Sequence, residues 1–285
     1  MEFRCHIPKG PLREFVDAIH FLSGKEIGTG IAFPRMNQVI IINLGSSFIV
    51  SPVYADRNRY GGTTNTAVWM NGKQDEPFML ENAGTTAMYT IGLKLGMVPF
   101  FADLPALETS NQALAAENWA PRDIFTLRDR LLACPDISSG FLLIEQYLEG
   151  LLKHKDLSLL HRVTWMAKAM HTQSVEEICH SLGMTRKRLR TESHQYFGGA
   201  VKNIQGIIRL NKTLETIATT SEGTLSSLHE YFDQSHFIRD FKARTGITPL
   251  QYRRLCRQFP FIARTPNFLA LTSETFLQCI SAQGS

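Results

Sequence analysis

The sequence predicts an α+β protein in which a β-rich amino-terminal domain with flanking helices precedes an all-α carboxyl-terminal domain. Short β-branched runs that end at glycine dominate the first hundred residues, and helical apolar periodicity follows from about residue 122. Charge divides the chain in the same way. Residues 1–154 carry 13 Lys and Arg against 16 Asp and Glu, whereas residues 155–260 carry 16 against 9. Only the second part therefore has the basic balance expected of a polyanion-binding domain.

Three stretches of the first domain have strand composition. QVIIINLGSSFIVS (38–51) is rich in β-branched residues, and AVWMNG (67–72) and AMYTIGLKLG (87–96) both end at glycine. DRNRYGGTTN (56–65) predicts a loop or hairpin connection, because its paired glycines adopt positive φ at low cost. We therefore expect a small barrel or sandwich over about residues 20–97.

Two helices are predicted after this β-rich region. RDIFTLRDRLLA (122–133) and SGFLLIEQYLEGLLKHK (139–155) repeat apolar residues at helical spacing, and Pro135 separates them. The second helix has two interpretations. It either covers the barrel, or it uses its outer apolar residues to pair with a second subunit. These outer residues are Leu143, Tyr147 and Leu151.

Every element after about residue 155 is predicted to be helical. Proline is sparse, and Gly183, Gly198 and Gly246 stand where helices should end. The domains are thus predicted at 1–154, the β-rich domain, and at 155–258, the helical domain. Residues 259–285 form an extension with too many apolar residues for a free tail, and the sequence does not indicate where it packs.

One motif occurs twice in the helical domain, at residues 174–198 and 224–246. Each copy has a hydroxyl residue, a short helix, a turn, a second hydroxyl residue, a second helix and a glycine, and Ser174 with Glu177 forms a capping box. The residues expected in the two cores are Val175, Ile178, Cys179, Leu182 and Leu189, then Leu225, Leu228, Tyr231, Phe237 and Phe241. This is the pattern of two helix-turn-helix units, whose second helices enter the major groove of DNA.

The second copy resembles a known family. LSSLHEYFDQSHFIRDFKARTGITPLQYRR (225–254) is similar to the second helix-turn-helix of AraC/XylS-type transcription regulators, and the Arg209-Leu210 pair also fits that family. The resemblance covers about residues 156–257. It implies a sequence-specific regulator that places two recognition helices in successive major grooves of double-stranded DNA.

The resemblance also implies which side chains contact DNA. Those of the second copy that would face the groove are Gln234, Ser235, His236 and Arg239, and those nearer phosphates are Lys242, Arg244 and Arg253. The first copy supplies Arg186, Lys187, Arg188 and Arg190, of which Lys187 and Arg190 join Gln234, His236 and Arg239 in reading bases. Arg and Gln make bidentate hydrogen bonds to base edges, which explains why these residue types suit the role.

The first copy departs from the family pattern at three positions. The family usually has a basic residue at Thr191, a core aromatic at Ser193 and a proline at Val201. Tyr196 or Phe197 is expected to supply the missing aromatic. We expect the second copy to carry more of the sequence discrimination. The alternative is a ligand- or protein-binding module whose degenerate DNA domain grips DNA only non-specifically.

The first domain resembles the cupin-like sensory domains attached to some of these regulators. A small-molecule effector and RNA polymerase are the further partners that this resemblance allows, and it favours a homodimer over a monomer. No ligand residue carries over. An apolar set either holds a small ligand or forms plain core: Phe33, Ile41, Phe48, Trp69 and Tyr89.

Other classes of function find no support in the sequence. Residues 20–100 contain one histidine, His20, so we expect no metal site and no cofactor. The five cysteines are odd in number and far apart, which favours reduced thiols, and Cys5 beside Arg4 and His6 is better explained as an ordinary terminal thiol than as an alkyl acceptor. No P-loop, G-x-G-x-x-G or G-x-S-x-G motif occurs, so no catalytic residue is predicted. A cytoplasmic protein without a membrane span is expected.

Overall fold

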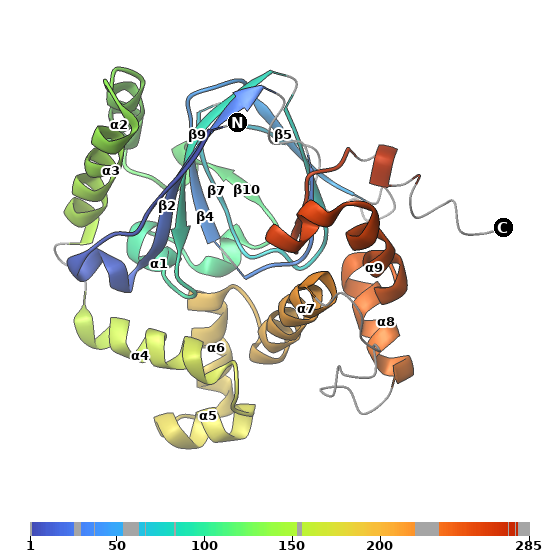
Figure 1. The fold of residues 1–285 in the computed structure, drawn as a ribbon. Helices are drawn as coiled ribbons and strands as arrows, with labels where there is room; N and C mark the ends of the chain where they lie inside the picture. The colour runs from blue at the N-terminus through green and yellow to red at the C-terminus, as the bar shows by residue number, and fades with distance from the viewer. Residues whose placement is uncertain are drawn as a thin grey trace.

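The computed structural model describes residues 2–25, 30–36, 38–53, 63–65, 67–82, 84–152, 156–219, 234–272, 274–276 and 278. A β-barrel forms the upper part of the molecule in Figure 1, two helices flank it, and the remaining helices lie against its lower end. The predicted α+β architecture is confirmed, with ten of the eleven described strands before residue 116 and six helices between residues 157 and 258. None of the described helices is long and apolar enough to cross a membrane.

Two antiparallel sheets form the barrel within the described residues. The first has the order β1-β2-β9-β4-β7-β10 and the second the order β11-β3-β8-β5-β6. The strands of the first sheet are β1 (Glu2–His6), β2 (Val16–Lys25), β4 (Gln38–Asn43), β7 (Val68–Asn71), β9 (Thr85–Leu93) and β10 (Ala113–Ala115). Those of the second are β3 (Gly30–Ala32), β5 (Phe48–Pro52), β6 (Thr63–Asn65), β8 (Phe78–Glu81) and β11 (Phe268–Leu269).

Alternation along the strands separates two apolar clusters. Ile41 packs inside the barrel with Phe48, Trp69 and Met88. Their neighbours on the opposite face join the large cluster shared with the helices. Tyr89 belongs to this outer cluster because it lies directly opposite Ile42, whose side chain also points outward. The apolar set expected from the sequence is therefore divided between the two faces of the sheet. Its remaining member, Phe33, belongs to a third cluster.

The flanking helices match the prediction to within a few residues. α2 (Asp123–Leu132) and α3 (Ile137–Leu152) form a hairpin beside the first sheet (Figure 1). α3 buries Ile144 and Leu148 in the outer cluster. Shorter helical turns cover the barrel end: η1 (Gly10–Glu14), α1 (Val98–Phe101), η3 (Ala106–Thr109) and η4 (Ala116–Asn118).

The outer apolar residues of α3 also pack within the chain. Leu143, Tyr147 and Leu151 are half-buried against the outer cluster, and the Tyr147 hydroxyl donates to Asp123 Oδ1 in α2 at 3.3 Å. These three side chains therefore pack against the barrel side of the chain, as the first interpretation expects, and the pairing with a second subunit stays a prediction.

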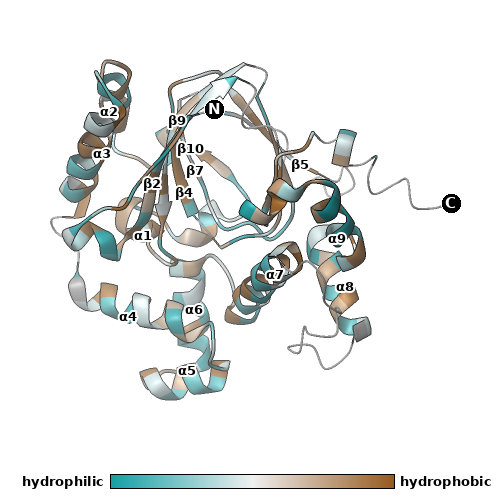
Figure 2. Ribbon diagram, in the orientation of Figure 1, coloured by the Kyte–Doolittle hydropathy of each residue, from teal (hydrophilic) through white to brown (hydrophobic). Residues whose placement is uncertain are grey.

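Six helices make up the second domain in its described part. They are α4 (Leu157–Ala169), α5 (Val175–Leu182), α6 (Arg186–Phe197), α7 (Val201–Thr219), α8 (Gln234–Thr245) and α9 (Pro249–Gln258). α7 runs beneath the barrel, with α5 and α6 on one side and α8 and α9 on the other (Figure 1). The strands contain many apolar residues, whereas α6 is largely hydrophilic (Figure 2).

The carboxyl-terminal extension returns to the barrel, an arrangement that the sequence does not reveal. After η6 (Pro260–Arg264), β11 pairs with β3, so that Leu269 lies opposite Ile31. Phe276 is fully buried and contacts Phe33 edge-on. These residues share one apolar cluster with Tyr252 and the core of α8. The extension thus joins the second helix-turn-helix to the second sheet.

Candidate nucleic-acid interface

The first helix-turn-helix unit is built by α5 and α6. The Ser174 hydroxyl accepts from Glu177 N at 3.2 Å and Glu177 Oε2 accepts from Ser174 N at 2.7 Å, so the predicted capping box is present. Gly183 ends α5 at φ 59°, a left-handed conformation that favours glycine. Thr185 then caps α6 by accepting from Arg188 N. Ile178 is buried between the two helices, which fixes their angle.

α6 exposes all four basic residues that were predicted for it. Arg186 pairs with Glu176 at 2.5 Å and Arg188 with Glu192 at 3.0 Å. Lys187 and Arg190 are exposed and form no ion pair among the described residues. The helix therefore carries two unneutralised cations, together with two that can exchange a carboxylate for a phosphate.

The departures of this unit from the family pattern are accommodated. Ser193 is fully buried, and its hydroxyl donates to the Gly199 carbonyl at 2.5 Å, so it is a satisfied polar residue in the core. Tyr196 and Phe197 are both buried and supply the aromatic bulk, as expected. Thr191 is exposed. The buried Ser193 hydroxyl thus has a hydrogen-bond partner.

In the second unit, α8 has two different faces. Phe237 and Phe241 are buried with ring centroids 5.9 Å apart, and Tyr252 of α9 lies 6.1 Å from Phe241. Ser235 and His236 are exposed on the other side. The apolar face predicted from the sequence is therefore present. The expected partners Leu225, Leu228 and Tyr231, and the side chain of Gln234, lie outside the described residues.

The basic residues of this unit differ in their surroundings. Arg239 is exposed and its Nε donates to the Ser235 carbonyl one turn earlier at 3.2 Å. Lys242 is exposed and Arg253 is half-buried. These positions suit groups that reach a DNA surface.

Arg244 lies differently from the others. Only 19% of its side chain is exposed, its Nε contacts Asp240 at 3.2 Å, and its Nη1 donates to Asn203 of α7 at 3.3 Å. A Cβ atom on Gly206 would overlap its guanidinium, so the glycine makes room for it. The structure thus turns inward a side chain that the family resemblance assigns to phosphate.

α7 determines how far apart the two units lie. It has 19 residues and is therefore about 28 Å long at 1.5 Å per residue. Its buried residues contact both apolar clusters of the domain, Ile204 and Ile207 on one side and Leu210 and Leu214 on the other. One helical turn of DNA is about 34 Å. α7 has a length comparable to the separation of successive major grooves.

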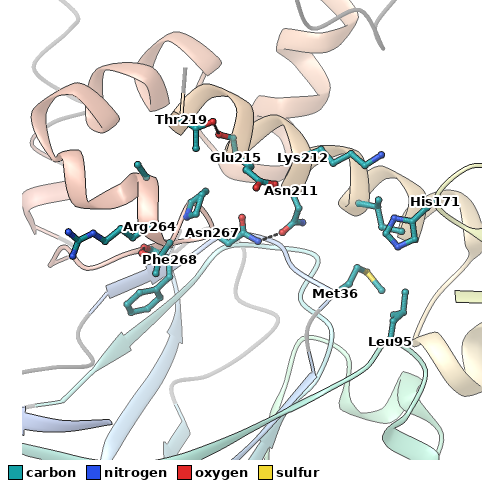
Figure 3. Close-up of a pocket in the computed structure, with 14 residues that line it drawn as sticks. Met36, Leu95, His171, Asn211, Lys212, Glu215, Thr219, Arg264, Asn267 and Phe268 are labelled. Atoms are coloured by element: carbon teal, nitrogen blue, oxygen red, sulfur yellow. Dashed lines mark hydrogen bonds between the residues drawn. The ribbon is translucent and has the colours of Figure 1, made fainter. Parts of the chain in front are cut away.

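A groove of about 540 Å³ lies where α7, the extension and the barrel meet. Met36 and Leu95 come from the barrel, Lys212 and Glu215 from α7, and Arg264 from the extension, as Figure 3 shows. The side chains of Asn267 and Asn211 hydrogen-bond across its floor. Burial and the nearby Lys212 lower the pKa of His171, which also lines the groove. In the described part of the chain, no group of three or more His, Cys, Asp or Glu side chains is placed to hold a metal ion.

Comparisons with known proteins give one family match over a short segment and several structural matches over most of the chain. Residues 226–254 match the family of bacterial regulatory helix-turn-helix proteins, AraC family. No curated protein matches the chain. Among solved structures, ToxT from Vibrio cholerae matches with 12% identity and a TM-score of 0.44, covering 90% of this chain and 99% of that one. An apo ToxT variant gives 15% identity, a TM-score of 0.43 and coverage of 84% and 97%. ToxT bound to an unsaturated fatty acid gives 15%, 0.41, 88% and 94%.

Proposed function

We propose that this chain is an AraC-type DNA-binding transcription regulator that reads two successive major grooves with α6 and α8. The observation that carries the proposal is the pair of faces of α8, inside the matched segment. Phe237 and Phe241 hold the helix in the core, and His236 and Arg239 are left outward. A recognition helix needs this combination, because its core face fixes the orientation at which polar groups meet base edges.

Each side chain predicted to contact DNA has a proposed role, except for the inward-turned Arg244. Arg239 and His236 of the second unit read bases, together with Lys187 and Arg190 of the first. Arg186, Arg188, Lys242 and Arg253 contact phosphates, and Gln234 and Ser235 complete the base-reading set. Phosphate contacts give affinity that falls with salt, whereas base contacts give sequence preference.

The length of α7 supports the two-groove arrangement. A linker helix about 28 Å long is comparable with one turn of DNA, which is the separation that two recognition helices in successive major grooves need. The satisfied core of the first unit, with Ser193 hydrogen-bonded and Phe197 buried, also supports its taking part. The alternative of a degenerate DNA domain rests on Thr191, Ser193 and Val201, and of these Ser193 is hydrogen-bonded in the core.

A small-molecule effector is the second part of the proposal. The groove between α7, the extension and the barrel brings Lys212 and Arg264 together with apolar Met36 and Leu95. A ligand that contacts both domains there shifts the arrangement of the recognition helices only if it binds one arrangement more tightly. The exchange of Lys212 for Glu should abolish the response of DNA affinity to such a ligand while leaving basal DNA binding nearly unchanged.

Selection of sheared genomic DNA by the purified full-length protein at near-physiological salt tests the main proposal. Sequencing of the retained fragments should give a recurrent site with two elements about 10 base pairs apart. Uniform retention that fades as salt rises would mean that the basic face only grips phosphate, and the degenerate-domain alternative would replace the proposal.

A further inference from the structure

One small surface of the barrel touches both helix-turn-helix units. It consists of residues 72–75, which follow β7, and residues 106–111, formed by η3 and the turn after it; we call it the ledge. Lys73 is fully buried, and its Nζ lies 2.5 Å from each Asp75 carboxylate oxygen. Asn111 Nδ2 donates to Asp75 Oδ2 at 3.1 Å, and Asp75 N donates back to Asn111 Oδ1 at 2.6 Å.

The ledge is a rigidly defined surface. Asn111 has φ 59°, a left-handed conformation that Asn tolerates better than most residues, and its N–H donates to the Lys73 carbonyl at 2.7 Å. Both the oxygen and the nitrogen of its side-chain amide are hydrogen-bonded to Asp75. The carboxylate of Asp75 is therefore held from the barrel side by Lys73 and Asn111.

The first unit meets the ledge at the end of its recognition helix. Gly198, which follows α6, accepts a hydrogen bond from Ser110 Oγ at 2.9 Å. Gly198 has φ 74°, and a Cβ there would overlap the Ser110 hydroxyl, so the contact requires glycine. A Cβ on Gly199 would lie 3.4 Å from Lys73 Cε. The backbone that ends α6 thus rests directly on the ledge.

The second unit reaches the same carboxylate through two side chains. Asn203 of α7 donates from Nδ2 to Asp75 Oδ1 at 2.7 Å. Its Oδ1 accepts from Arg244 Nη1 at 3.3 Å, and Arg244 Nε contacts Asp240 within α8 at 3.2 Å. Gly206 leaves the space that the guanidinium fills. A continuous chain of hydrogen bonds therefore runs from the barrel to recognition helix α8.

The charged groups along this series of hydrogen bonds affect one another. Burial lowers the pKa of Lys73, Asp75 opposes that shift by its charge and hydrogen bond, and Arg244 lowers the pKa of Lys73 further. Two cations thus stand on either side of Asp75 and Asn203. Removal of the carboxylate would leave a buried ammonium unpaired and facing a guanidinium, an arrangement that costs several times more than the loss of a surface pair.

We propose that Asp75 is a positioning residue that sets both recognition helices in register on the barrel, so that the ledge fixes the spacing of the two DNA elements. Asp75 touches no DNA in this scheme. It acts through Asn203 on Arg244, while Ser110 holds the end of α6 by its hydrogen bond to Gly198 and Lys73 lies close to Gly199. The inference rests on the proposed two-groove function, and it makes the barrel a part of the DNA-reading machinery.

The test measures the affinity of the full-length protein for its selected site with the two elements moved apart or together by one or two base pairs. Wild type should prefer one spacing by roughly tenfold or more, because a misplaced helix forfeits at least one charged hydrogen bond. In Asp75→Asn and Asn203→Ala the preference should fall several-fold, with affinity for random DNA unchanged. Asn203→Ala leaves the Lys73–Asp75 pair intact, so it remains informative if Asp75→Asn does not fold.

Exchanging the carboxylate and the amide between positions 75 and 203 should rescue the spacing preference. The double variant Asp75→Asn/Asn203→Asp keeps one carboxylate between Lys73 and Arg244 and should restore most of the spacing preference. Asp17→Asn, at an exposed acid of β2, is the matched control and should behave as wild type. Unchanged spacing preference in both single variants would overturn the inference. A wild-type protein with no spacing preference would instead overturn the two-groove function beneath it.

Discussion

Replacement of Gly206 by Ala tests whether Arg244 is held where the structure places it. Gly206 lies in the interior of α7, where the backbone is helical and alanine is ordinarily preferred. An added methyl group would overlap the Arg244 guanidinium. Since the flexible end of Arg244 gives way more easily than the α7 backbone, we expect the guanidinium to leave its site.

The magnitude follows from the contacts that Arg244 would lose. Its hydrogen bond to Asn203 involves a charged group and is worth about 1.5–3 kcal/mol. Its pair with Asp240 adds about 0.3–0.5 kcal/mol, as usual for ion pairs four residues apart. The exchange of Gly for Ala in a helix returns up to about 1 kcal/mol. The net result is a loss of about 1–2.5 kcal/mol in the free energy of unfolding.

Gly150→Ala is the matched control. Gly150 is also helical, in α3, and a Cβ there would meet nothing within 4 Å. This variant should gain up to about 1 kcal/mol. Urea unfolding measures both changes, and the melting temperature should move by roughly 2–4 °C per kcal/mol in opposite directions. Equal stabilisation of the two variants would refute the placement of Arg244.

Three further predictions concern the extension, the barrel and the DNA. Phe276→Ala should cost about 3–5 kcal/mol, as expected for a fully buried Phe, whereas Phe261→Ala, at a partly exposed Phe, should cost less than about 1 kcal/mol in the same unfolding assay. Burial raises the pKa of Tyr89 to about 12, so the folded state keeps a proton that the unfolded state loses near pH 10. The free energy of unfolding should therefore fall as the pH rises from 10 to 12. Urea unfolding at several pH values should show a smaller fall for Tyr89→Phe. Arg239→Ala should cost roughly 1–3 kcal/mol of binding at the selected site and little on random DNA, whereas Lys242→Ala should weaken both about equally; equal losses in Arg239→Ala would make it a phosphate contact.

Local signals account for most of the fold. The β-branched run at residues 38–51 and the glycine exits gave the predicted strands β4, β7 and β9, because side-chain shape and turn chemistry act within a few residues. The helix ends at Gly183 and Gly246 were predictable for the same reason. β2 was missed, since its mixture of apolar and polar residues has no clean period of two. β11 was missed because two residues become a strand only by pairing with β3, more than 200 residues away.

The candidate site was predictable only in part. The apolar spacing of Phe237 and Phe241 fixed which face of α8 is buried, and so identified Arg239 as outward. Arg244 is equally basic and close in sequence, yet it turns inward because Gly206 and Asn203 of another helix provide space and an acceptor. No local pattern encodes such a long-range partner. The role of Asp75 was invisible for the same reason.

Hydroxyl-radical footprinting of the wild-type protein on its selected site tests the central claim most directly. We expect two protected segments on one side of the duplex, about 10 base pairs apart, as two recognition helices in successive major grooves require. Alanine at both Lys187 and Arg190 should remove one segment, and alanine at Arg239 should weaken the other. Protection of a single segment that only the Arg239 variant alters would contradict the account, because α6 would then take no part in reading DNA.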